Sequence, residues 1–147
     1  ERPVSYMAKI ELFENPIFGA AIRRCHAFPV KRGASDRGAI KAAVTVLKEG
    51  HMLGLFPEGT RSKTGELQKA EAGIALIASM TGAPIVPVAI LNSHRIFANG
   101  GLLPQLRIMY GVPISFQGDR KSKEALDAFS AEIMAHIERM RDALSKM

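Results

Sequence analysis

The amino-acid sequence predicts an α/β fold in which helices flank a mixed, largely parallel sheet. Short apolar runs that suit strands alternate with longer segments whose apolar residues recur at helical spacing. The chain has 147 residues, a length that suits one domain with a buried core. We therefore predict a single domain over residues 1–147. Within it, residues 119–147 are expected to carry a terminal amphipathic helix that packs on the rest.

Strand and helix signals alternate along the first half of the chain. Asn15 and Pro16 interrupt the first apolar run, Asp36 suits an N-cap, and Gly50 suits a helix end. Two arginines close the first short helix, where positive charge opposes the helix dipole. The elements expected here are a strand or helix start at 6–13, a helix at 18–24, a strand at 27–30, a helix at 37–48 and a strand at 52–56.

The second half contains a long uncharged stretch, residues 72–93. Gly82 and Pro84 lie in its middle, so we expect a buried helix, a turn and a buried strand there, not a membrane span. The apolar residues of the last helix step by three or four and leave charges opposite, which favours packing on the domain over docking on a membrane. The elements expected are helices at 70–80 and 122–146 and strands at 85–91 and 106–110.

Composition favours an anionic partner. The formal net charge is +6, and residues 1–118 hold this excess, with 14 Lys/Arg against 8 Asp/Glu. Phosphate esters, acidic carrier proteins and anionic lipid surfaces all suit such a charge. Aromatic residues make up only 6% and tryptophan is absent, so a nucleic-acid-binding α/β domain is the weaker alternative.

The histidines and the cysteine offer no obvious reactive or metal centre. The four histidines and one cysteine lack metal-ligand spacing, and no P-loop motif is present, so we predict no metal and no cofactor. Cys25 and His26 are adjacent, which would suit an activated thiolate. Neighbours on a strand point to opposite faces, so we interpret Cys25 as a small buried apolar residue.

The chemically densest stretch is Phe56-Pro57-Glu58-Gly59-Thr60-Arg61-Ser62, which follows the strand predicted at 52–56. Proline cannot donate to a sheet ladder, so the chain must leave the sheet there. Gly59 permits a positive φ or a close backbone approach. Arg61 offers a planar fork that matches a phosphate or a carboxylate. Ligands bind at this edge of open α/β sheets, although a plain turn with a surface ion pair would also suit the residues.

These seven residues resemble the third signature block of the 1-acylglycerol-3-phosphate acyltransferase (lysophosphatidate acyltransferase) family. Three further stretches are similar to it: the segment around Lys9 (residues 7–13), the second block (residues 28–32) and the apolar fourth block (residues 85–90). Residues 68–75 also lie where the family has a lysine-bearing helix start. The resemblance runs from Arg2 to about Phe116 and implies a glycerolipid-acyltransferase-like fold.

The resemblance implies acyl transfer from acyl-CoA or acyl-carrier protein to lysophosphatidate, which gives phosphatidate for phospholipid biosynthesis. It also implies peripheral contact with the cytoplasmic face of a membrane. Two arginines, Arg32 and Arg61, are the expected phosphate clamps, with Lys9 as a helper. The remaining substrate-binding residues implied by the third block are Phe56, Pro57, Glu58, Gly59 and Thr60. Of these, Gly59 and Thr60 would shape the pocket, and Glu58 would orient an arginine or the glycerol backbone.

One block of the family is missing from these residues. The family's Asn-His-x4-Asp block supplies a catalytic histidine and aspartate, but no histidine here has an aspartate five positions later. We expect that pair upstream of Glu1, so the 147-residue chain is expected to be N-terminally truncated, to hold no catalytic residue and to be inactive alone. A non-catalytic lipid-phosphate-binding module is the main alternative function.

Overall fold

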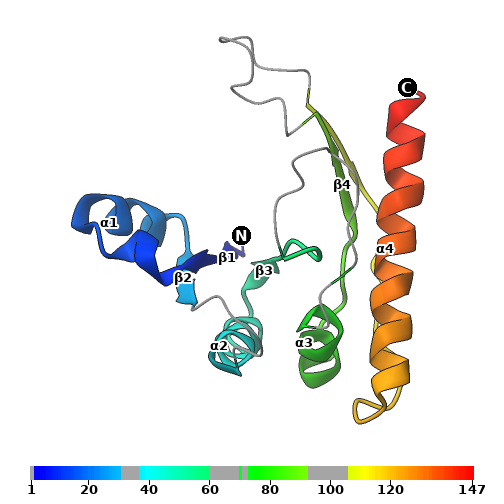
Figure 1. Cartoon of the computed structure of the whole chain (residues 1–147), viewed down its shortest axis with the longest axis horizontal. Helices are drawn as coiled ribbons and strands as arrows, with labels where there is room; N and C mark the ends of the chain where they lie inside the picture. The colour runs from blue at the N-terminus through cyan, green and yellow to red at the C-terminus, as the bar shows by residue number, and fades with distance from the viewer. Residues whose placement is uncertain (1, 31–36, 60–69, 71–72, 93–105) are drawn as a thin grey trace. The chain divides into compact units, whose positions relative to one another are not determined.

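The structure is a computed structural model that describes residues 2–30, 37–59, 70, 73–92 and 106–147. Residues 1–55 and 56–147 form two compact units, and each is described by itself. The α/β class predicted from the sequence is confirmed: each unit combines helices with a small sheet, parallel in the first and antiparallel in the second (Figure 1).

The first unit contains a three-stranded parallel sheet with strand order β2-β1-β3. In this unit α1 packs near β2, and α2 packs near β3 (Figure 1). Its elements are β1 (Val4–Lys9), the short 3-10 helix η1 (Ile10–Phe13), α1 (Pro16–Arg24), β2 (Ala27–Val30), α2 (Arg37–Lys48) and β3 (Met52–Gly54).

Local capping explains where the first two helices begin or end. The Asn15 side chain accepts hydrogen bonds from the backbone N–H groups of Ile17 and Phe18, so α1 begins two residues earlier than expected. After α2, Gly50 has a φ of +82°. The Gly50 N–H donates to Leu47 O and the His51 N–H to Val46 O, which is the Schellman ending that a glycine there predicts.

Two strands are shorter than predicted, and proline is the reason in one of them. The predicted strand 85–91 is reduced to β4 (Val88–Leu91), because Pro87 has no N–H and only Ile85 forms an isolated bridge, with Ile114. The predicted strand 52–56 ends at Gly54, before the chain turns at Pro57. Residues 6–13 divide into the end of β1 and η1.

In the second unit, helix α4 packs along the antiparallel pair β4-β5, and α3 packs against α4 (Figure 1). The core contains Ile133, which is 1% exposed, and Phe129, whose ring meets Phe116 edge-to-face at 5.4 Å. The apolar stripe predicted on the last helix therefore faces its own unit. The elements are α3 (Gly73–Thr81), β4 (Val88–Leu91), β5 (Arg107–Tyr110) and α4 (Lys123–Ser145).

Both ends of α4 are anchored. At its N-terminus, the Ser122 hydroxyl accepts from the Ala125 N–H at 3.1 Å and donates to the Glu124 carboxylate at 3.0 Å. Near its C-terminus, Arg107 of β5 donates to the carbonyl oxygen of Leu144 at 3.1 Å, where positive charge is favourable. Among the described residues, none of the helices has both the length and the apolar character needed to cross a membrane.

Replacing Ser122 by alanine is expected to cost about 1 kcal/mol of stability, because an N-cap acceptor is lost. Hydrogen bonds from the Glu124 backbone N–H and the Ser122 hydroxyl hold the pKa of Glu124 below its usual 4.5. Because the pKa of Glu124 is lowered in the folded state, its ionised carboxylate stabilises the fold above pH 4.5. This contribution to stability is lost as the pH falls through the folded-state pKa of Glu124. Urea unfolding at pH 7 and pH 3 measures this: between the two pH values, Ser122→Ala should lose less unfolding free energy than the parent. As a control, Ser145→Ala should leave the unfolding free energy at each pH within about 0.5 kcal/mol of the parent.

Candidate functional site

The first unit forms a sheet edge suited to binding a ligand. β1 lies in the centre, and the chain places β2 on one side of it and β3 on the other. In open α/β sheets the ligand-binding crevice lies outside the carboxyl ends of the strands, at the point where the strand order reverses. Here the reversal lies between β1 and β3. The predicted site residue Lys9 ends β1 at this edge.

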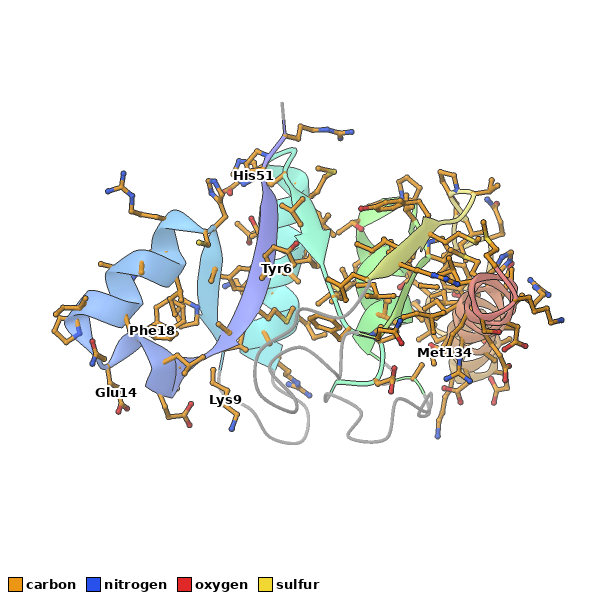
Figure 2. The ribbon with its side chains drawn as sticks, turned by 90° about the horizontal axis from the view of Figure 1, so that it is seen from above. Tyr6, Lys9, Glu14, Phe18, His51 and Met134 are labelled. Carbon is orange, nitrogen blue, oxygen red and sulfur yellow. The ribbon has the colours of Figure 1, made fainter. Side chains whose placement is uncertain are left out.

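Lys9 is exposed and lies opposite Val30, the last residue of β2, in the parallel register. In Figure 2 its side chain projects from the end of β1. Arg32, the predicted phosphate clamp, comes two residues after Val30 in the chain but lies outside the described residues. The structure thus places one of the three predicted cations at the carboxyl edge of the parallel sheet.

Tyr6 and Gly54 form a close pair across the strands at the reversal, which the sequence interpretation missed. They are register partners in the β1-β3 pairing. A Cβ placed on Gly54 would collide with Cε1 and Cδ1 of the Tyr6 ring, so the missing side chain makes room for that ring. A glycine inside a strand often marks such a close approach, and Gly54 in the apolar run was the signal that could have revealed it.

In the second unit, residues 56–59 form a hydrogen-bonded turn. The Gly59 N–H donates to Phe56 O at 3.0 Å, and Gly59 has a φ of +64°. Pro57 in the second position and glycine in the fourth suit a turn of this kind. Of the two possibilities that the sequence left open for Gly59, a positive φ or a close backbone approach, the structure shows the positive φ. Its N–H is engaged within the turn.

The residues of this turn differ in their exposure to solvent. Phe56 is 68% exposed, while Pro57 and Glu58 are half-buried. Thr60 and Arg61, the remaining predicted site residues, lie outside the described residues. The phosphate-binding roles of Arg32, Arg61 and Lys9 therefore stay predictions.

The Cys25–His26 pair lies in a turn, not on a strand as expected. The chain turns there because α1 runs to Arg24, Cys25 caps it, and His26 takes a left-handed φ of +57°. The His26 N–H donates to Arg23 O and its carbonyl accepts from the Tyr6 N–H, which connects the helix end to β1. Cys25 is exposed, so its interpretation as a buried apolar residue was wrong.

The second unit also has an open hollow of about 280 Å³ between residues 115–118 and the first turns of α4. Phe116 and Phe129 line it together with the Glu132 side chain. Among the described residues, none that the sequence predicts to bind substrate lines this hollow.

Comparison with known proteins identifies relatives over nearly the whole chain. The acyltransferase family model matches residues 1–91. A 1-acyl-sn-glycerol-3-phosphate acyltransferase of Bacillus subtilis is 34% identical over 98% of this chain and 72% of its own length. One of Streptococcus pneumoniae is also 34% identical, over 92% of this chain and 50% of its own.

A solved structure has the same fold. The 1-acyl-sn-glycerophosphate (LPA) acyltransferase of Thermotoga maritima superposes with a TM-score of 0.73 at 25% identity, covering 99% of this chain and 58% of that protein. The resemblance inferred from the third signature block is confirmed by these matches. The chain belongs to the acyltransferase family.

Proposed function

We propose that the whole protein transfers an acyl group from acyl-CoA or acyl-carrier protein to the free hydroxyl of 1-acyl-sn-glycerol-3-phosphate, giving phosphatidate. The observation that carries the proposal is the 34% identity, over 98% of this chain, with a relative named for that acceptor. The proposal concerns the whole protein because this chain spans only 72% of that relative and 58% of the related structure.

The reaction needs a base for the acceptor hydroxyl, donors for the tetrahedral oxyanion and cations for the acceptor phosphate. We assign the third task to this chain. Lys9 supports the assignment, because it ends the central strand at the edge where parallel sheets bind ligands. In the proposal Arg32 and Arg61 complete the phosphate site, and Glu58 orients one of them or the glycerol.

We assign the base to a histidine outside these 147 residues, because none of the four histidines present has an aspartate five positions later. The acceptor is an amphiphile with its phosphate in the headgroup layer. We therefore place the reaction at the cytoplasmic membrane surface, with peripheral contact.

The test is release of free thiol from acyl-CoA by the whole protein, measured with lysophosphatidate as the acceptor and repeated with glycerol 3-phosphate. Acyl transfer that requires lysophosphatidate supports the proposal. Transfer only to glycerol 3-phosphate would show that the acceptor is wrong. Lysophosphatidate binding without thiol release, with either acyl donor, would instead identify a lipid-phosphate-binding module.

A further inference from the structure

Residues 10–24, which we call the η1–α1 segment, expose several large apolar side chains. Ile17 is 84% exposed and Phe18 is 50% exposed. Ile10 and Leu12 of η1 are also exposed. Gly19 is the one residue of α1 that is buried. Such a cluster on one short segment differs from singly scattered surface residues and indicates a contact surface.

Two apolar residues of α1 share a face with a cation. Residues four and seven apart lie on the same side of a helix, so Ile17, Ala21 and Arg24 form one face, and all three are exposed. Gly19 lies on the opposite side, where an added Cβ would be 2.9 Å from Phe13 O. The close backbone contact at Gly19 thus turns the Ile17 face away from η1.

Short-range contacts fix this orientation. The Asn15 side chain caps α1 with hydrogen bonds of 3.1 and 3.0 Å. The Arg23 guanidinium lies 4.9 Å from the centre of the Phe13 ring, which connects the last turn of α1 to η1. These contacts therefore hold the exposed apolar face in a fixed orientation relative to η1. Figure 2 labels Phe18 and Glu14 on this segment.

The charges around the face suit an anionic surface. Three cations and two carboxylates are exposed here: Lys9, Arg23, Arg24, Glu11 and Glu14. Both arginines lie in the last turn of α1. Arginine can bury its aliphatic stem while its charged end stays at the polar boundary. An apolar face with arginines at one end matches a bilayer whose headgroups are anionic, into which such a helix sinks its apolar side chains.

We propose that the η1–α1 segment docks the protein on an anionic lipid surface, with Ile17 as the apolar anchor of that face and Arg24 at the headgroup phosphates. Phe18, about a quarter turn of the helix away, is a second and less exposed anchor. This inference rests on the proposed function, because a lipid acceptor requires the enzyme to work at a membrane. The segment begins directly after Lys9. Docking therefore holds the carboxyl end of β1, where we expect the acceptor phosphate, close to the headgroup layer.

Flotation of the 147-residue chain with vesicles tests this proposal. We expect the chain to float with vesicles of phosphatidylglycerol and phosphatidylcholine, and Ile17→Gln/Phe18→Gln to lower its partition coefficient by about tenfold or more, since two apolar side chains lose their burial. Val112→Gln is the matched control, because Val112 is 76% exposed on the second unit, and it should float like the parent. Arg24→Gln, which leaves the contact of Arg23 with the Phe13 ring in place, should weaken binding about fivefold, and only to anionic vesicles.

Three results would overturn the proposal: a parent chain that does not float, a double variant that floats as well as the parent, or a loss that Val112→Gln reproduces. Binding to an acyl-carrier protein that the double variant loses, with vesicle binding unchanged, would assign the face to that acidic partner instead. Flotation needs no catalysis. The proposed function is tested separately by thiol release from acyl-CoA, measured on the whole protein with lysophosphatidate dispersed in detergent as the acceptor.

Discussion

Replacing Arg61 by alanine in the whole protein is expected to raise the KM for lysophosphatidate by about 10- to 100-fold. A charged, two-pronged hydrogen bond to phosphate contributes about 1.5–3 kcal/mol, and each 1.4 kcal/mol is about a tenfold change in affinity. The phosphate does not change during acyl transfer, so this binding is equal in the ground and transition states, and kcat should change little. Steady-state kinetics with varied acceptor and saturating acyl-CoA measure both constants.

Two further variants separate geometry from charge. Arg61→Lys keeps the positive charge but loses the planar fork, so we expect an acceptor KM well above that of the parent. Arg139→Ala removes an exposed arginine from α4, far along the chain from the third signature block, and should leave the acceptor KM unchanged. If Arg61→Ala also leaves that KM unchanged, Arg61 has no part in binding the phosphate.

Features fixed by neighbouring residues were predictable from the sequence. Strand Ala27–Val30 and helix Arg37–Lys48 have the expected bounds, and Gly50 ends its helix as a glycine with positive φ. Gly59 has a positive φ, which is one of the two possibilities that the sequence left open for it. In each case a proline, which restricts the backbone, or a glycine, which adopts a positive φ without a steric penalty, lies within a few residues and decides the local structure.

Features that depend on which strands pair were not predictable in the same way. The contact of Tyr6 with Gly54 needs the β1-β3 register, which joins residues 48 positions apart. The turn at Cys25–His26 needs the helix end to meet β1, where the His26 carbonyl accepts from Tyr6. The candidate site has the same limit. Lys9 could be named from the sequence as a candidate, but its place at the carboxyl edge beside Val30 follows only from the β1-β2 register.

The second large effect concerns Ile133, which is expected to lose about 2–5 kcal/mol of unfolding free energy when replaced by alanine. The side chain is 1% exposed in the core formed with Ala75, Ala78 and Phe129, so its removal leaves a cavity that a helix fixed at both ends fills poorly. Urea unfolding monitored by circular dichroism measures the loss, and Val112→Ala, at an exposed position, should stay within about 0.5 kcal/mol of the parent.

The result also decides what the apolar stripe of α4 is for. If the stripe served to dock on a membrane, Ile133→Ala would lower vesicle binding and leave the unfolding free energy almost unchanged. Since Ile133 and Phe129 instead contact α3 residues and the Phe116 ring within their own unit, we expect the opposite pair of results. A loss below about 1 kcal/mol, well under the usual range for a buried isoleucine, would contradict the packing of α4 on this core.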